Sequence, residues 1–299
     1  MKYIKKLFLI TICLFTLSGC VFKKDSMEDI DIYTTIYPIK YLINQLYGDH
    51  STIKEIFPNG VNIDDYKLSN NKISDRRITD YSKSDLFVFN SLDIDRDYAV
   101  EMINKNKDLK IIDVSLGMTY SNSIEELWLN PYNYLMMAQN VKNGLLEYVT
   151  NPLLISNEDG TGIENKYEQL KYDLSKLDAN LKESINNANY KVIITDNNLL
   201  KYLEKYNLKV ISLEENDNLN NTTIEEVKKL IQDNKIKYIY STSTETNDTC
   251  KKLIADNNLE LITINSMRST DGGITDSSNE SYITVMNNNI DLLKKELYK

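Results

Sequence analysis

Short apolar runs alternate with amphipathic segments along most of the chain. The runs are rich in Ile, Val, Phe and Tyr, which favour strands, and several are continuously apolar, as strands buried in parallel sheets tend to be. The predicted strands cover residues 31–36, 51–56, 85–89, 110–114, 191–195, 208–213, 236–240 and 259–264. Because helical segments separate them, the expected fold class is α/β with parallel sheets.

Apolar residues that recur at spacings of three and four predict the helices between these strands. The predicted helices cover residues 39–47, 71–82, 98–105, 133–149, 163–188, 198–206, 247–256 and 282–297, with another beginning at Thr223. The longest, residues 163–188, separates two halves that each alternate strand and helix. We therefore expect two lobes, each with a parallel sheet flanked by helices, joined by one long backbone helix.

A chain of 299 residues is long enough for two domains of ordinary size. The predicted boundaries place an N-terminal α/β lobe at residues 29–155, a loop with the linking helix at 156–188, and a C-terminal α/β lobe at 189–299. Ligands of such sheets bind beyond the carboxyl ends of the strands, and this sequence places Asp196 and Asn265 at two such ends.

The first residues predict export and are not expected to belong to the fold. Residues 1–19 combine a lysine-rich start with an apolar run that has the length of a signal peptide. The run ends in Leu17-Ser18-Gly19-Cys20, which resembles a bacterial lipobox. We expect cleavage before Cys20, a diacylglyceryl group on its thiol and a short tether over residues 20–28, which would hold the mature chain at the extracytoplasmic face of a bacterial cell membrane. An ordinary signal peptide or an uncleaved anchor is the alternative.

Charge and composition exclude several classes of function. The formal net charge is −9, and an acidic chain lacks the basic field that a nucleic-acid partner requires. The one histidine, His50, excludes a zinc site built on several histidines. No Ser–His–Asp triad and no glycine-rich phosphate loop is assignable, so we expect no enzymatic activity. Cys250 has no second cysteine to pair with in the mature chain, and we expect it to be buried rather than reactive.

Several framework segments resemble one family of proteins over nearly all of the mature chain. The matching segments are residues 34–38, 57–61, 85–90, 128–131 and the long helix 163–188. They resemble the metal-binding lipoproteins that serve ABC importers for zinc and manganese. The resemblance implies a monomeric solute-binding protein that captures a divalent metal ion between its lobes and delivers it to an ABC permease and ATPase.

The metal site of that family consists of three histidines and one acidic residue, two from each lobe, and here every histidine position has changed. The resemblance places Asp64, Glu126 and Asp196 at the histidine positions and Asn265 at the acidic position. The neighbouring Asp65 and Glu125 are alternatives for the first two. Carboxylate and amide oxygens suit harder ions better than zinc, so the metal stays open among Mn²⁺, Zn²⁺ and other hard cations.

Carboxylates that converge without a cation repel one another, so this set needs a positive partner. That partner is a metal ion, a lysine or arginine, or an organic amine, and Arg268 lies close in sequence to Asn265. Each acid also has a structural interpretation: Asp64 as a turn residue, Glu126 on a solvated helix face and Asp196 as a helix N-cap. Two further functions therefore stay open, namely a repurposed cleft for a non-metal solute and a surface adhesin or interaction lipoprotein.

Overall fold

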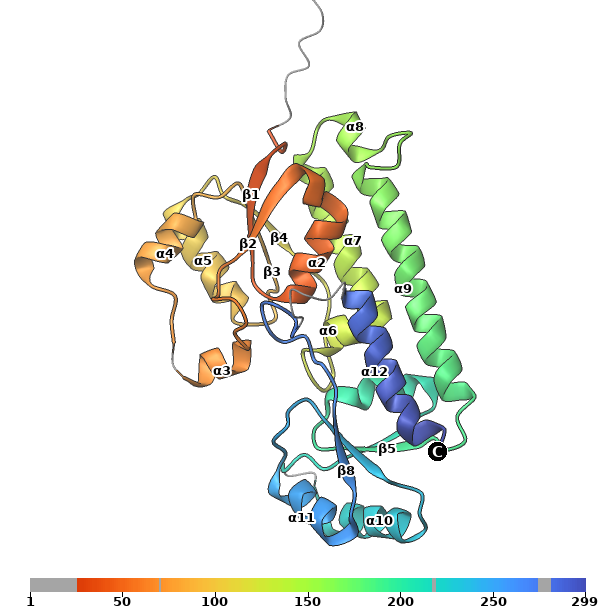
Figure 1. Cartoon of the computed structure of the whole chain (residues 1–299). Helices are drawn as coiled ribbons and strands as arrows, with labels where there is room; N and C mark the ends of the chain where they lie inside the picture. Colours follow the sequence, from red (N-terminus) through yellow and green to blue (C-terminus); the bar gives the residue numbers. More distant parts are fainter. Residues whose placement is uncertain (1–25, 70, 217–218, 274–280) are drawn as a thin grey trace, which may run out of the picture.

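The computed structural model describes residues 26–69, 71–216, 219–273 and 281–299. Within these ranges, two four-stranded parallel sheets form the centres of two lobes, which confirms the predicted fold class (Figure 1). The predicted signal peptide and Cys20 lie outside the described residues. No helix in the described ranges is both long enough and apolar enough to cross a membrane.

The two sheets share one topology. The first has the strand order β2-β1-β3-β4, and the second repeats it as β6-β5-β7-β8. The strands are β1 Ile30–Thr34, β2 Ser51–Glu55, β3 Leu86–Phe89, β4 Lys110–Asp113, β5 Val192–Thr195, β6 Lys209–Ser212, β7 Tyr238–Ser241 and β8 Glu260–Thr263. Each lies within two residues of its predicted bounds. All four residues of β3 are buried, as its continuous apolar run predicts.

The helices include short ones that the periodicity did not predict. The helices are α2 Tyr37–Tyr47, α3 Ile63–Leu68, α4 Asp75–Tyr81, α5 Asp95–Lys105, α6 Glu126–Leu129, α7 Pro131–Tyr148, α8 Pro152–Ile155, α9 Ile163–Asn186, α10 Asn221–Gln232, α11 Asp248–Asn257 and α12 Tyr282–Leu297, with 3₁₀ helices η1 Gly48–His50 and η2 Leu199–Tyr206. The unpredicted α3, α6 and α8 have six, four and four residues, too few for two turns of apolar spacing.

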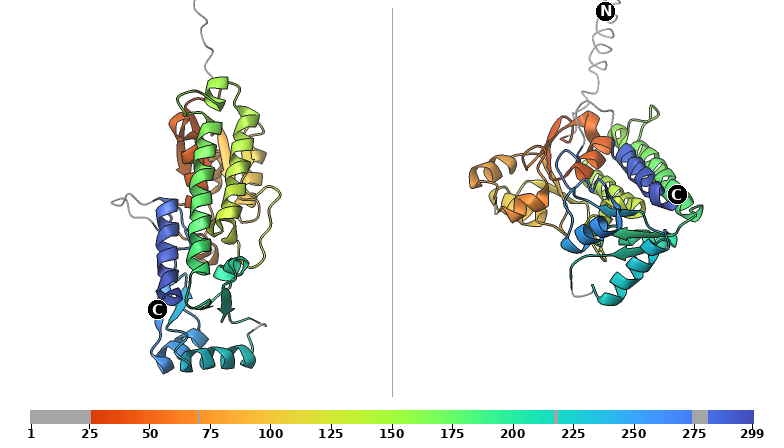
Figure 2. Two further views of the ribbon diagram at one scale, coloured as in Figure 1. Left: turned by 90° about the vertical axis from the view of Figure 1, so that its right-hand side faces the viewer. Right: turned by 60° about the horizontal axis from the view of Figure 1, so that its bottom comes forward.

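The long helix α9 joins the two lobes, as predicted, and two further helices pack along it. The long helix α9 runs along α7, and α12 lies beside α9 (Figures 1 and 2). The ring of Tyr282 in α12 stacks on Tyr134 in α7 at 4.0 Å between centroids, and its hydroxyl donates to the carbonyl of Trp128 at 2.5 Å. Thus α12, which the predicted boundary assigns to the C-terminal lobe, packs against helices that precede that lobe in the sequence.

Two apolar cores follow from this arrangement. The larger core unites the first sheet with α7, α9 and α12, and the smaller one lies between the second sheet and helices α10 and α11. Cys250 on α11 is fully buried in the smaller core, and burial raises the pKa of its thiol to about 12. The expectation of a buried cysteine is therefore confirmed, and a raised thiol pKa disfavours the reactive thiolate.

Candidate functional site

The segment that follows β8 leaves the second sheet and lies against the first lobe (Figure 1). We call residues 266–273 the strap. Ser269 of the strap pairs with Asn62 in an isolated antiparallel bridge. Hydrogen bonds from the first lobe to the strap are Tyr37 N to Ser269 O (3.0 Å), Ile63 N to Arg268 O (3.1 Å) and Trp128 Nε1 to Ser266 O (2.8 Å), and Thr270 N returns one to Val61 O (3.2 Å). The strap thus carries side chains of the second lobe onto the first.

Arg268 of the strap is the centre of an ion-pair cluster. Its side chain is 4% exposed, and its Nη1 lies 2.5 Å from Oδ2 of Asp93. Its Nε and Nη2 reach the two carboxylate oxygens of Asp64 at 3.2 and 3.1 Å, and Nε lies 3.5 Å from Oε1 of Glu125. The guanidinium also lies 5.6 Å from the ring centroid of Trp128. One cation therefore contacts three carboxylates of the first lobe, a pattern typical of arginine because of its forked donors.

The electrostatics of this cluster keep Asp93 and Arg268 charged. Burial acts to raise the pKa of Asp93, but the guanidinium of Arg268 and the ammonium of Lys67 outweigh burial, and the pKa is lowered from its ordinary value. Burial acts to lower the pKa of Arg268, yet Asp93 and Asp64 outweigh it and raise this pKa. Lys67 is the second cation, ion-paired with Asp93 and 3.9 Å from Asp64.

Asp64 is the predicted metal ligand that joins this cluster. It lies in the first turn of α3, where Asn62 caps the helix by accepting from the Asp64 amide at 2.8 Å. Its side chain is 51% exposed, so one side of the carboxylate faces solvent while the other binds Arg268. The structure thus places Asp64 in a helix rather than in a simple turn, and Arg268 is the positive partner of this acid.

Glu126 is buried and has a different set of partners. Its residue is 6% exposed, so it does not lie on a solvated helix face. Its carboxylate accepts from the amides of Ser121 (3.1 Å) and Asn122 (3.0 Å) and from the Asn122 side chain (2.8 Å). These bonds fix the loop before α6. Its neighbour Glu125 is the one that faces Arg268.

Asp196, directly after β5, is 8% exposed. Its Oδ2 accepts from the Thr246 hydroxyl at 2.9 Å, and its Oδ1 has no hydrogen-bond partner within the described residues. Burial raises the pKa of this carboxyl, and the nearby hydroxyls of Ser241 and Thr246 act in the opposite sense. Asp196 is not an N-cap, because the first amide of η2 is bound by Asn197.

Asn265 supports the strap. Its Nδ2 donates to the carbonyl of Gly272 at 2.9 Å, and its Oδ1 accepts from the amide of Met267 at 2.8 Å. Both ends of the amide side chain are therefore engaged in holding the strap in its fold. The oxygen Oδ1 is the only atom of this side chain that can bind a cation, because the amide nitrogen is a hydrogen-bond donor.

The four predicted ligands do not form one preassembled site. In the parts of the chain that the structure describes, no group of three or more His, Cys, Asp or Glu residues is placed to hold a metal ion. The acids that do meet are Asp64, Asp93 and Glu125, around Arg268. The sequence analysis missed Asp93, although it follows the end of β3 where ligands of parallel sheets bind. That Asp64, Glu126, Asp196 and Asn265 bind a metal stays a prediction.

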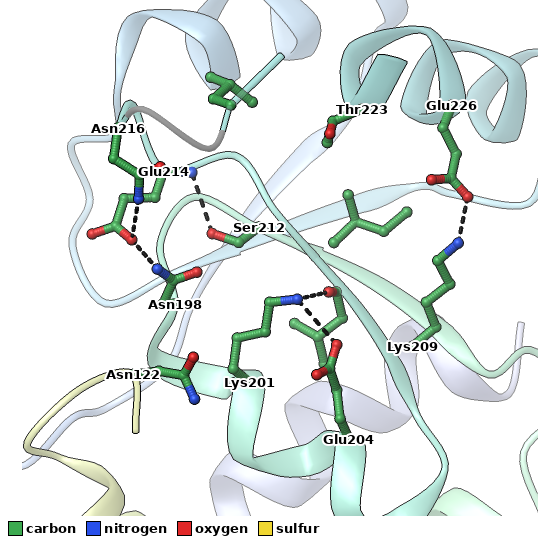
Figure 3. Close-up of a pocket in the computed structure, with 13 residues that line it drawn as sticks. Asn122, Asn198, Lys201, Glu204, Lys209, Ser212, Glu214, Asn216, Thr223 and Glu226 are labelled. Atoms are coloured by element: carbon green, nitrogen blue, oxygen red, sulfur yellow. Dashed lines mark hydrogen bonds and ion pairs between the residues drawn. The ribbon is translucent and has the colours of Figure 1, made fainter. Parts of the chain in front are cut away.

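A separate pocket of about 450 Å³ opens beside the edge strand β6. Its charged side chains are engaged with one another: Lys201 with Glu204, Lys209 with Glu226, and Glu214 with Asn198 and Asn216 (Figure 3). Lys201 also donates to the carbonyl of Val210 at 2.7 Å. This bond occupies a backbone acceptor on the edge strand, which would otherwise be open to pairing with another strand. The pocket therefore offers little unpaired charge to a ligand.

Comparison with known proteins places the chain in a family. The model of the family described as "Zinc-uptake complex component A periplasmic" matches residues 32–296. The zinc-binding lipoprotein AdcA of Streptococcus pneumoniae is 22% identical over 97% of this chain. The chain spans about 60% of the length of that relative.

Solved structures share the fold. The Zn(II)-bound ZnuA-like domain of AdcA from Streptococcus pneumoniae superposes with a TM-score of 0.69 at 20% identity, covering 91% of this chain and 100% of that one. The metal-dependent lipoprotein YcdH of Bacillus subtilis gives a TM-score of 0.68 at 18% identity, covering 91% of this chain and 100% of that one. The family is described by zinc uptake and AdcA by zinc binding, in agreement with the expectation of a solute-binding protein rather than an enzyme. The chain belongs to the family of the periplasmic component A of zinc-uptake complexes.

Proposed function

We propose that this protein is the solute-binding lipoprotein of an ABC importer, anchored through a lipid on Cys20 at the extracytoplasmic face of a bacterial cell membrane. Its partners are an ABC permease and ATPase, and it acts as a monomer. Family membership over residues 32–296 and the two joined lobes support this role. A lipid anchor keeps the protein close to its permease and so raises its effective concentration there.

The cargo that we propose is a divalent metal ion of the manganese and zinc class. The observation that carries this proposal is Oδ1 of Asp196, a buried carboxylate oxygen at a strand end that has no hydrogen-bond partner within the described residues and that a cation would satisfy. The proposed ligands are Asp64, Glu126, Asp196 and Asn265. Asp64 supplies a half-exposed carboxylate on the first lobe, and Asp196 supplies a carboxylate on the second.

Capture by this set requires a rearrangement, because Glu126 and Asn265 are engaged with the backbone. An ion that binds oxygens of both lobes stabilises the conformation in which they converge, in proportion to its difference in affinity for the two states. The layer of α7, α9 and α12 between the lobes favours a small movement over a wide hinge swing.

The test is thermal unfolding of the full chain in detergent, stripped with chelator and titrated with Mn²⁺, Zn²⁺, Ca²⁺ and Mg²⁺. An ion that binds only the native state adds about 2.7 kcal/mol to the free energy of unfolding at one hundred times its Kd. We expect Asp196→Ala to abolish the rise in Tm, and the exposed Asp80→Ala to leave it unchanged. No shift with any of the four ions would overturn the metal cargo.

A second candidate is the same scaffold with a cleft repurposed for a non-metal solute, or a role as a surface interaction lipoprotein. The observation that favours it is the missing group of three or more metal-binding side chains among the described residues. A chain that unfolds at the same temperature with and without metals, yet binds its permease, would support the non-metal solute. A protein that binds neither a metal ion nor the permease would support the role as a surface interaction lipoprotein.

A further inference from the structure

We propose that Arg268 is a built-in cation of the interlobe site, which a divalent ion must displace before it binds Asp64. This inference rests on the proposed function. It identifies Arg268 as the residue that sets the affinity of the site for a metal ion and the charge of the ion that the site accepts. It starts from the ion-pair cluster, where the guanidinium already holds both carboxylate oxygens of Asp64.

The position of Arg268 makes it a direct competitor of a metal ion for the carboxylate of Asp64. Its side chain is 4% exposed, whereas that of Asp64 is 51% exposed, so the guanidinium fills the inner side of the carboxylate and solvent reaches the outer side. An incoming ion therefore meets a carboxylate whose two oxygens are already bound. Full coordination by Asp64 then requires the bonds to Nε and Nη2 to break.

Charge balance gives the same result. Three carboxylates, Asp64, Asp93 and Glu125, face two cations, Arg268 and Lys67, which leaves one negative charge uncompensated. These two fixed cations repel a divalent ion that approaches Asp64. Without the guanidinium, the cluster of Asp64, Asp93 and Glu125 has two uncompensated negative charges and attracts a divalent ion more strongly.

The strap explains how displacement is coupled to the lobes. The side chain of Arg268 and its backbone carbonyl, which accepts from Ile63 at 3.1 Å, hold the same stretch of strap against α3. Release of the guanidinium removes the charged part of this contact and leaves the backbone part. Metal capture and loosening of the strap are therefore linked, so each favours the other.

The test measures metal affinity by competition with a fluorescent chelator for Mn²⁺ and Zn²⁺, in the full chain and in Arg268→Met. Met fills a similar length beside Trp128 without charge. We expect Arg268→Met to bind metal at least about tenfold more tightly, because no guanidinium has to leave Asp64. Asp64→Asn in the Arg268→Met background should remove this gain, and the exposed Arg76→Met should leave the affinity of the wild type unchanged.

The outcomes separate this inference from the proposed function. Equal metal affinity of wild type and Arg268→Met overturns the inference and leaves the cargo standing. Binding by Arg268→Met with none by the wild type supports the inference and overturns the metal cargo. No binding by either overturns both.

If Arg268→Met does not fold, as judged by circular dichroism, Arg268→Lys replaces it. A lysine keeps the charge but loses the forked pair of bonds to Asp64, so we expect a smaller gain in metal affinity. No gain with Arg268→Lys would then overturn the inference.

Discussion

At the scale of single residues, the chemistry of the site is decided by which partner each acid finds. Asp64 meets an arginine, Glu126 meets backbone amides, and Asp196 keeps one oxygen without a partner among the described residues. The sequence offered the same side-chain type at all three positions. Arg268 contacts Glu125 rather than Glu126 because of where the strap lies. No local sequence pattern predicts the position of the strap.

Asp95 provides a prediction at this scale. It is 2% exposed at the start of α5, and it accepts from the hydroxyl of Thr35 at 2.6 Å and from the amide of Asn90 at 3.2 Å. Burial, with a smaller effect of the nearby Asp93, raises the pKa of Asp95 to about 6. The folded state then keeps a proton that the unfolded state releases near pH 4, so the free energy of unfolding falls as pH rises from about 4 to about 6.

We expect a total loss of about 3 kcal/mol from well below pH 4 to well above pH 6, of which about 2 kcal/mol falls within this window. Asp95→Asn keeps an acceptor oxygen and removes the titration, so its stability should not fall between pH 4 and 6. Urea unfolding at several pH values measures this, with the exposed Asp97→Asn as control. If the Asp95→Asn variant keeps the pH dependence of the wild type, the assignment to Asp95 is contradicted.

At the scale of elements, the strap and two short helices position the site. Helix α3 carries Asp64, and α6 follows directly from Glu125. The strap turns back at Gly272, where φ is +66° and a Cβ would lie 2.5 Å from Cδ1 of Tyr37. Only glycine allows both this backbone conformation and this close approach.

Gly272→Ala should therefore weaken the attachment of the strap. We expect a loss of roughly 1–2 kcal/mol from the left-handed backbone alone, and more from the contact with Tyr37. Gly160→Ala is the matched control, because φ there is +81° and a Cβ would meet nothing within 4 Å. Denaturant unfolding of both proteins isolates the contact with Tyr37. Equal losses in the two proteins would show that the contact does not matter.

At the scale of the whole molecule, one core spans the connection between the lobes. Helix α9 buries an apolar stripe that faces α7 on one side and α12 on the other. The start of α12, at Tyr282, packs on the first lobe, whereas Glu296 near its end accepts from the amides of Lys237 and Tyr238 in the second lobe, so α12 bridges the two lobes (Figure 2). We expect the larger core to unfold as one unit.

Leu177→Ala in α9 tests this expectation. Leu177 is 2% exposed, and removal of its side chain should cost about 2–5 kcal/mol. The exposed Tyr172→Ala on the same helix should change the stability by less than about 0.5 kcal/mol. Fluorescence of Trp128 and far-ultraviolet circular dichroism should report the same shifted transition in Leu177→Ala. Two separate transitions would contradict the single unit.

The sequence by itself determined the strands, the long helix and the α/β class, because these depend on apolar periodicity within short windows. The sequence also showed acidic residues near strand ends and placed Arg268 among several candidates for the positive partner of these acids. Tertiary structure alone decided that the strap crosses to the first lobe, that Arg268 binds Asp64, Asp93 and Glu125, and that α12 joins α9. These contacts join residues far apart in the chain, and the free energy of such a contact depends on burial and charge that no local window contains.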